Sequence, residues 1–476
     1  MSKDAHENFK EEIFMVVQHN MQAMNANRML NITTSSQAKS TEKLSSGYKI
    51  NRAADDAAGL SISEKMRKQI RGLDQASTNA QDGISAVQTA EGALTEVHDM
   101  LQRMNELAVQ AANGTNSESD RVAIQNENTQ LTTEIDRVAE TTKFNETYLL
   151  KGNGKSSTAI VTAKDAGIEG NLTGLGTGTA EFTMDALKTG QTISIGAKGY
   201  TIGTEVSEVK DEVEGASNGD TVTINGTEYK IAAKTSEADY EYTATDLAKV
   251  VKDGDTVIIG TQTYVAMKDE DSDNVGDNDA AIITADKAYE LISEELRKAS
   301  SVGTDPGSEA TMGTVPTGEY SSTNTQVTFT ITEGKVQVDQ GLQLGVHVGA
   351  DADGSNKIAF TIDTLDAAGL GIKGLSVVDN TGAKATYAID AIADAISKVS
   401  AQRSELGAIQ NRLEHTIANL DNVVENTTAA ESQIRDTDMA ETMVEYSKNN
   451  ILAQAGQSML AQANQATSGV MSILQG

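Results

Sequence analysis

The chain has 476 residues, no cysteine, no tryptophan and a formal net charge of −31 at pH 7. The lack of cysteine excludes disulfides, thiolate metal sites and cysteine nucleophiles. Only 4% of the residues are aromatic, which disfavours an enzyme with a large aromatic-lined pocket. Residues 151–390 hold 38 acidic residues against 18 basic ones. A protein that binds nucleic acid or an anionic membrane needs basic patches, so the net negative charge of this part disfavours both kinds of partner.

The N-terminus shows no targeting segment. No run of 18 apolar residues is present, so no membrane span is predicted, and residues 1–20 lack the regions of a secretory signal peptide. We interpret residues 1–14 as a translated leader or disordered tail and Met15 as the true start. This hypothesis depends on the Lys-Glu-Glu run at residues 10–12, whose codons can contain a bacterial ribosome-binding sequence, and on the helical pattern that follows Met15.

Two helical patterns follow in the N-terminal part of the chain. The first is amphipathic, has apolar residues at Val17, Met21, Met24, Met29 and Ile32, and ends near Gly47, a residue suited to a left-handed C-cap. The second has one apolar heptad position that recurs at Met66, Leu73, Ala80, Val87, Leu94, Leu101 and Ala108. A helix of about 50 residues would be roughly 75 Å long, and its sustained seven-residue period indicates supercoiling against other helices.

A third N-terminal helix is predicted after a capping pattern at Ser117 and Asp120. Its apolar positions are Ile124, Leu131, Ile135 and Val138. The C-terminal end, residues 391–476, has the same kind of apolar helical period as the N-terminal part. Its apolar positions are Ile392, Ile396, Val399, Leu406, Ile409, Leu413, Ile417, Leu420 and Val424 and, after an interruption at residues 436–438, Leu452, Met459, Ala463, Ala466, Val470 and Ile473. Such a pattern requires partner helices, so both ends of the chain are predicted to form one antiparallel helical bundle or coiled coil.

The central part is predicted to be an α+β region rich in hairpins. Three segments, Gly190–Tyr200, Gly219–Tyr229 and Gly254–Tyr264, share the order turn, strand, glycine-containing turn, strand. Helical patterns follow the second and third copies, at residues 245–251 and 286–298. Alternating patterns at residues 327–331 and 336–338 predict a further hairpin, and a strand is predicted at residues 357–362.

No catalytic, cofactor or metal site is predicted. The five histidines lie in different segments without ligand spacing. The acidic run Asp269–Asp279 resembles a calcium loop but lacks the bidentate glutamate at its twelfth position. Gly174–Gly178 resembles a phosphate-binding turn only in its glycine content, so we interpret it as a loop.

A possible protein-contact face lies in the long second helix. Arg103, Glu106 and Leu107 are off the apolar heptad position. The simpler interpretation is an exposed i,i+3 pair between Arg103 and Glu106, worth about 0.2–0.5 kcal/mol. The alternative is a surface that binds another protein.

Several stretches closely resemble bacterial flagellin. They are NMQAMNANRMLN, LSSGYKINRAADDAAGLSISEKMR and LQRMNELAVQAANGT near the N-terminus and SAQRSELGAIQNRLEHTIANLDNVVENTTAAESQIRDTDMAETMVEYSKNNILAQAGQSMLAQANQ near the C-terminus. The resemblance implies a terminal coiled-coil domain in the filament core, from residues 15–57 and 436–476. It also implies a helical bundle domain with β-hairpins, from residues 58–188 and 323–435, and a variable outer domain, from residues 189–322.

The resemblance also implies a function. The chain would be a structural subunit that leaves the cell by flagellar type III export and assembles into the extracellular filament, with its terminal helices becoming ordered on polymerisation. The implied partners are other copies of the chain, an export chaperone, the filament cap and hook-associated proteins. The residues expected in the polymerisation seam are Met21, Met24, Leu452, Met459, Ala463, Ala466, Val470 and Ile473.

The family's surface for Toll-like receptor 5 maps onto six residues of this chain. They are Gln102, Arg103, Glu106, Leu107, Gln110 and Glu127. Asn105 departs from the basic residue often found at its position. Two other functions stay open: a hook–filament junction protein, which would share the helical ends, and a secreted adhesin with a ligand site in residues 190–325.

Overall fold

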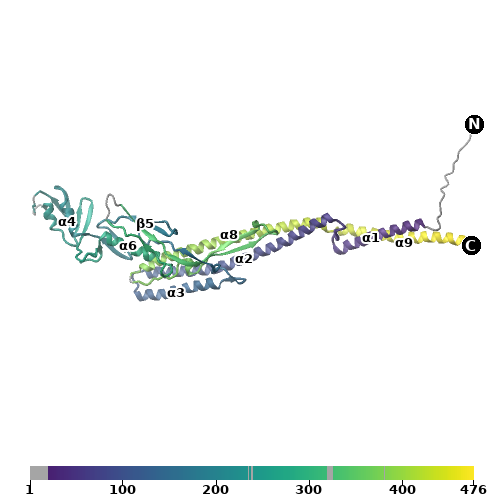
Figure 1. Cartoon of the computed structure of the whole chain (residues 1–476), viewed down its shortest axis with the longest axis horizontal. Coiled ribbons are helices and arrows are strands. Elements are labelled where there is room, and N and C mark those ends of the chain that lie inside the picture. The colour runs from purple at the N-terminus through teal and green to yellow at the C-terminus, as the bar shows by residue number, and fades with distance from the viewer. Residues whose placement is uncertain (1–19, 234, 237–239, 319–324, 380, 476) are drawn as a thin grey trace, which may run out of the picture. The chain divides into compact units, whose positions relative to one another are not determined.

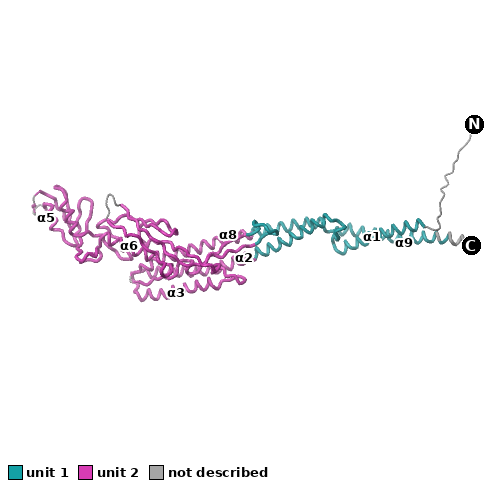
Figure 2. The backbone as a smooth tube through the Cα atoms, viewed as in Figure 1, with its two compact units in different colours: residues 1–81, 347–357, 415–476 teal, residues 82–346, 358–414 magenta. Residues whose placement is uncertain are grey.

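The computed structural model (Figure 1) describes residues 20–475 except 234, 237–239, 319–324 and 380. The proposed start at Met15 and the segment 1–14 lie outside the described residues. The chain divides into two compact units (Figure 2). Unit 1 comprises residues 1–81, 347–357 and 415–476, and unit 2 comprises residues 82–346 and 358–414.

Unit 1 contains an antiparallel pair of terminal helices, α1 (Met21–Ser46) and α9 (Met439–Gln475). The Asn20 side chain caps α1 by accepting from the Ala23 N–H, and its amide donates to the Ala463 carbonyl oxygen of α9 at 3.1 Å. At the other end of α1, Gly47 has the predicted left-handed conformation, with φ of 74°. We call this pair the terminal hairpin.

Two longer helices, α2 (Ala57–Ala112) and α8 (Ala383–Arg435), also run antiparallel. Within unit 1, Arg435 Nη1 lies 2.6 Å from Glu64 Oε1, and within unit 2, Arg403 Nη2 lies 3.9 Å from Glu91 Oε1. The predicted apolar period of α2 is fully buried from Ala80 to Ala108, and that of α8 is buried or half-buried throughout. The predicted helical fold of both ends is therefore confirmed.

Helix α3 (Glu118–Thr141) completes the helical core of unit 2, where it packs with α2 and α8. The predicted capping pattern is present, because the Ser117 hydroxyl accepts from the Asp120 N–H and the Asp120 carboxylate accepts from the Ser117 N–H. Arg121 is buried and donates to three carbonyl oxygens, those of Ala111 at 2.8 Å, Asp379 at 3.0 Å and Asn113 at 3.3 Å. This guanidinium therefore joins the end of α2, the start of α3 and the segment before α8.

Several strands of unit 2 form small sheets beside this core. Strand β3 (Ser156–Ile160) pairs with β17 (Lys335–Asp339), and β18 (Leu342–His347) pairs with β19 (Lys357–Ile362). A four-stranded sheet has the order β15 (Thr311–Met312), β16 (Gln326–Thr332), β5 (Thr179–Asp185), β4 (Asn171–Thr173). Two short elements are the pair β1 (Lys143–Phe144) with β2 (Thr147–Tyr148) and the helix α7 (Ala367–Leu370).

The prediction of a hairpin between residues 327–331 and 336–338 was wrong. Both strands exist as β16 and β17, but β16 pairs with β5 and β17 pairs with β3. The reason is Glu333, which lies between them and is buried. Its carboxylate accepts from the N–H groups of Gly176 at 2.8 Å, Gly178 at 2.9 Å and Ala163 at 3.1 Å, so the connection is tied to other loops.

The three repeated segments form antiparallel hairpins, as predicted. They are β6 (Thr192–Ile195) with β7 (Lys198–Ile202), β9 (Thr221–Ile224) with β10 (Thr227–Ile231), and β12 (Thr256–Ile259) with β13 (Gln262–Met267). Each begins with the same backbone bond, in which the glycine N–H donates to a carbonyl oxygen of the second strand, at 2.7, 2.9 and 2.8 Å in chain order.

Each hairpin is followed by a two-residue strand and a helix. The first copy continues into β8 (Thr204–Glu205) and α4 (Val206–Glu214), the second into β11 (Glu241–Tyr242) and α5 (Ala244–Ala248), and the third into β14 (Ile282–Ile283) and α6 (Ala285–Ser300). The sequence predicted the helices of the second and third copies and missed α4. The full repeat is thus three strands and a helix.

The first and third copies exchange their third strands. Strand β11 pairs in parallel with β10 of its own copy, whereas β8 pairs with β13 and β14 pairs with β7. Only Gly203 separates β7 from β8, and one residue cannot form the crossover that a parallel neighbour requires. The exchange creates a separate hydrophobic core made only of residues 206–266, which we call the distal core.

Replacing Arg121 by methionine should destabilise unit 2 by about 3 kcal/mol, because three backbone carbonyl oxygens lose the charged donor that a buried side chain gives them. The free energy of unfolding of the full chain in urea, followed by circular dichroism, measures this change. Arg137→Met on the same helix is the matched control, since Arg137 is exposed and, among the described residues, forms an ion pair only with Glu134. An exposed pair of this kind is worth at most about 1 kcal/mol, so equal losses in the two variants would contradict the role of Arg121.

Candidate interaction surfaces

The two helices of the terminal hairpin meet through a heptad series in which small and polar residues outnumber large apolar ones. Along α1 the buried or half-buried positions of this series are Ala23, Ala26, Leu30, Thr33, Gln37, Ser40 and Leu44. Along α9 they are Thr442, Tyr446, Asn449, Ala453, Gly456, Leu460 and Ala463. The alternating steps of three and four residues are those of a coiled-coil contact. We call these fourteen positions the inner seam.

Buried polar groups in the inner seam reduce the stability of the contact between α1 and α9. Ser40, Thr442 and Asn449 are all buried, and the side-chain nitrogen of Asn449 has no hydrogen-bond partner among the described residues. A buried amide without a partner costs about 1–3 kcal/mol. The inner seam therefore brings two helices together without the apolar burial that stabilises an ordinary coiled coil.

Apart from Leu30, Leu44 and Leu460, most large apolar side chains in the described part of these helices point away from the inner seam. Met21 and Met24 are 68% and 61% exposed. We call the exposed apolar residues of the terminal hairpin the outer apolar surface. They are Met21, Met24, Met29, Ile32, Met439, Met443, Val444, Ile451, Leu452 and Met459. Exposed apolar groups in this number mark an interaction site on a protein surface.

The structure divides the predicted polymerisation seam between these two faces. Ala463 lies in the inner seam, whereas Met21, Met24, Leu452 and Met459 belong to the outer apolar surface and Ala466 is also exposed. The side chains of Val470 and Ile473 lie outside the described residues. Most of the inner seam was not predicted, because its members form no period of large apolar residues. The signal in the sequence is the three-four spacing of small and polar residues, as at Thr33, Gln37 and Ser40.

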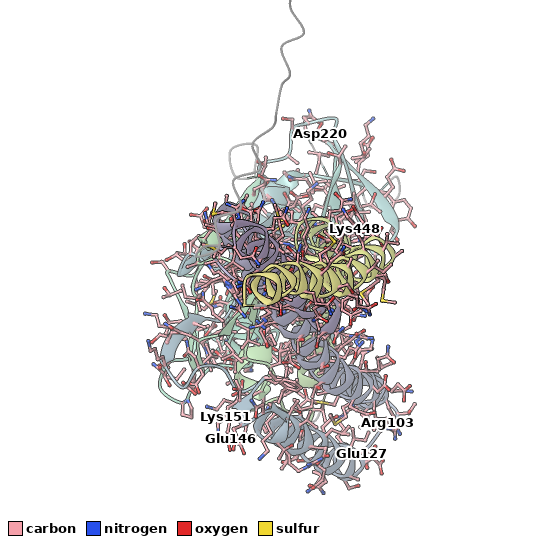
Figure 3. All side chains as sticks on the ribbon, turned by 90° about the vertical axis from the view of Figure 1, so that its right-hand side faces the viewer. Arg103, Glu127, Glu146, Lys151, Asp220 and Lys448 are labelled. Carbon is pink, nitrogen blue, oxygen red and sulfur yellow. The ribbon has the colours of Figure 1, made fainter. Side chains whose placement is uncertain are left out.

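A second surface surrounds Arg103 on α2. Figure 3 shows Arg103 and Glu127 on neighbouring helices. Arg103 Nε donates to Glu127 Oε1 at 2.9 Å, and Arg103 Nη1 donates to Glu106 Oε2 at 3.0 Å. These bonds, first to Glu127 and then to Glu106, raise the pKa of Arg103 further above its usual value. The predicted i,i+3 pair is thus present and extended by α3.

Besides Arg103, five residues were predicted to contact the receptor. Four of them lie on this exposed surface, and the fifth, Leu107, does not. Gln102, Glu106, Gln110 and Glu127 are exposed. Leu107 is only 2% exposed and packs in the core, so its predicted contact through the side chain is corrected. The buried face of α2 is wider than one heptad position because α3 and α8 both pack against it.

The other candidate sites from the sequence have simpler explanations. The carboxylates of Asp269, Asp271 and Asp273 come within 4.8 Å of one another, and the charge of Asp273 raises the pKa of Asp271. Exposed acidic groups often gather in this way without a metal ion. The loop Gly174–Gly178 directs two N–H groups at an anion, but that anion is the carboxylate of Glu333. None of the helices in the described residues is long and apolar enough to cross a membrane.

Comparison with known proteins shows similarity along nearly the whole chain. Residues 17–155 match the family model of the bacterial flagellin N-terminal helical region, and residues 389–474 match that of the C-terminal helical region. A flagellin of Clostridium tyrobutyricum is 40% identical over 95% of this chain and 100% of its own length. Polar flagellin A of Vibrio parahaemolyticus is 35% identical over 96% and 99%. The solved structure of FliC from Burkholderia pseudomallei is 18% identical over 69% of this chain and 99% of its own, with a TM-score of 0.24.

Replacing Asn449 by alanine should stabilise the terminal hairpin by about 1–2 kcal/mol, because it removes a buried amide without a partner and adds a better helix former. The expected result is a higher helix content by circular dichroism and slower proteolysis of the termini in the unassembled chain. Asn450→Ala, at the neighbouring half-buried position, should show only the smaller gain from helix propensity. A loss of helix content in Asn449→Ala would contradict the polar weakness of the inner seam.

Proposed function

Because the chain belongs to the bacterial flagellin family, we propose that the outer apolar surface, and not the inner seam, forms the contacts between subunits in the filament. The chain is a structural subunit of the extracellular bacterial flagellar filament. The observation that supports the proposal is the exposure of ten large apolar side chains on the terminal hairpin, where an ordinary helix pair would bury such side chains between its helices.

The energetics of burial favour assembly through this surface. Burying one large apolar side chain contributes about 1.5–3 kcal/mol, and the outer apolar surface has ten such side chains. The inner seam offers mostly Ala, Ser, Thr, Asn and Gly. Neighbouring copies that cover Met21, Met24, Leu452 and Met459 would therefore supply most of the stability of the terminal hairpin. This supports an ordering of α1 and α9 on polymerisation.

The predicted division into domains stays part of the proposal. Residues 15–57 and 436–476 would form the filament core, residues 58–188 and 323–435 the helical bundle domain, and residues 189–322 the outer domain. Hook-associated proteins and the filament cap would meet the chain at the ends of the polymer. We assign no catalytic activity to any of these domains.

The outer apolar surface of α9 would also need protection before assembly. Met439, Met443, Val444, Ile451 and Leu452 are exposed along one helix. An amphipathic helix with such residues fits a hydrophobic groove, which is how an export chaperone would hold it. The chain would then pass unfolded through the flagellar type III export apparatus.

The Arg103 surface would bind Toll-like receptor 5. The guanidinium is bonded to Glu127 from α3 and to Glu106 from α2, and these two bonds restrict its orientation. A charged group that is already ordered loses less conformational entropy on binding. Gln102 and Gln110 would add polar contacts, and the buried Leu107 would act only by packing beneath them.

Met24→Asp should slow seeded filament growth at least tenfold, because a charge would be buried between subunits. The terminal hairpin itself should keep its helix content, since Met24 lies outside the inner seam. Light scattering and electron microscopy after seeding with short filament fragments measure growth. Gln22→Asp introduces the same charge on the exposed flank of α1 and should grow normally. Equal growth of the two variants would overturn the role of the outer apolar surface.

Arg103→Ala should weaken binding to the Toll-like receptor 5 ectodomain at least tenfold, as expected when an interface loses a central arginine. Surface plasmon resonance with the unassembled chain gives the affinity. Arg137→Ala removes another exposed arginine, which pairs with Glu134 on α3, and should leave the affinity within twofold. An unchanged affinity in Arg103→Ala would place the receptor contact elsewhere.

A further inference from the structure

Arg435 is the last residue of α8 and is nearly buried, with 12% of its side chain exposed. Its Nη1 lies 2.6 Å from Glu64 Oε1 of α2. The guanidinium carbon lies 4.9 Å from the centroid of the Tyr48 ring, in the connection between α1 and α2. We call these three residues the Arg435 clasp. All three belong to unit 1.

The backbone joins the same two connections. The Lys49 N–H donates to the Arg435 carbonyl oxygen at 2.6 Å, and the Thr437 N–H donates to the Gly47 carbonyl oxygen at 3.0 Å. Tyr48 and Asp436 also form an isolated antiparallel β-bridge. The connection from α1 to α2 and the connection from α8 to α9 therefore lie side by side where the terminal hairpin begins.

The chemistry of the clasp requires an arginine. A planar guanidinium can stack on a tyrosine ring and bind a carboxylate at the same time, whereas an ammonium group offers only a point charge. The Nε atom of Arg435 is buried and has no partner among the described residues. The ring of Tyr48 and the carboxylate of Glu64 are therefore the two contacts that hold this side chain.

A neighbouring pair shows the difference between this contact and an ordinary surface pair. Arg67 also approaches Glu64, with Nη1 at 3.8 Å from Oε1, but its side chain is 35% exposed. Arg52 and Glu42 form another pair across the connection, and both side chains are exposed to solvent. Exposed pairs contribute at most about 1 kcal/mol, so neither fixes a helix direction.

We propose that Arg435 is a positioning residue, which fixes the direction in which the terminal hairpin leaves the α2–α8 pair and thereby the geometry of subunit contact. This inference rests on the proposed function, in which α1 and α9 make the contacts between subunits. Helix α1 has 26 residues and is therefore about 39 Å long. A change of about 10° at the clasp would displace its far end by roughly 7 Å, more than the roughly 5.4 Å of one helical turn.

The first test measures the clasp in the unassembled chain. The protein has no tryptophan, so Tyr48→Trp places a single tryptophan beneath the guanidinium while keeping an aromatic face, and its fluorescence can be excited apart from that of the tyrosines. Adding Arg435→Lys to this variant should at least double the rate at which acrylamide quenches the fluorescence. Adding Arg67→Lys instead should leave the quenching unchanged. Equal quenching in all three chains would show that Arg435 does not cover residue 48 and would overturn the proposal.

The second test measures filament geometry with otherwise unaltered full-length chains. Arg435→Lys, seeded with native fragments, should give filaments whose helical pitch and diameter differ from the native ones, or growth reduced at least tenfold. Tyr48→Leu should give the same change, and Arg67→Lys should give native filaments. Circular dichroism must first show native helix content, and any variant that fails this check is replaced by Glu64→Gln.

The outcomes separate this inference from the proposed function. Native filaments from Arg435→Lys and Tyr48→Leu overturn the positioning role and leave the outer apolar surface untouched. Normal growth of Met24→Asp overturns the outer apolar surface, whatever the clasp variants do. Altered filaments from both clasp variants, together with native filaments from Arg67→Lys, support the proposal.

Discussion

The rest of this structure depends on one constraint: two terminal helices meet mostly through small and polar residues and leave most of their large apolar side chains outside. A helix pair built in this way gains little from its own contact, because Ser40, Thr442 and Asn449 occupy positions that a stable coiled coil gives to leucine or isoleucine. The missing apolar burial has to come from other molecules. A structural subunit that must remain unpolymerised until it reaches the growing end of a filament benefits from this arrangement.

Unit 2 shows the opposite design. From Val87 to Ala108 the period of α2 is buried inside the chain, in a hydrophobic core that it shares with α3 and α8. Arg121 and Glu333 then tie loops to this core through backbone groups, one as a buried donor and one as a buried acceptor. Stability within the chain and association between chains are thus assigned to different helices: α2, α3 and α8 build the core of unit 2, and α1 and α9 carry the outer apolar surface.

Much of the helical core of unit 2 could be predicted from the sequence, because a sustained heptad period of apolar residues indicates which face of a helix is buried. The seven-residue period of α2, the capping residues of α3 and the three hairpins all follow local rules, and each is present. The errors arose where distant parts of the chain decide the outcome. Leu107 is buried because two helices cover α2, and β16 and β17 are separated because Glu333 binds other loops. The inner seam consists mostly of small and polar residues, so no period of large apolar residues marks it.

The exchange of strands between the first and third repeats has a consequence for how such a chain can change over generations. Residues 206–266 build the distal core by themselves, and the chain enters and leaves this part at neighbouring points, where the Gly203 N–H donates to the Ile283 carbonyl oxygen at 2.8 Å. Material added or lost between these points leaves both entry strands, β7 and β14, in place. The sequence of the distal core can therefore vary, in length as well as in composition, without a change in the long helices at the two ends of the chain.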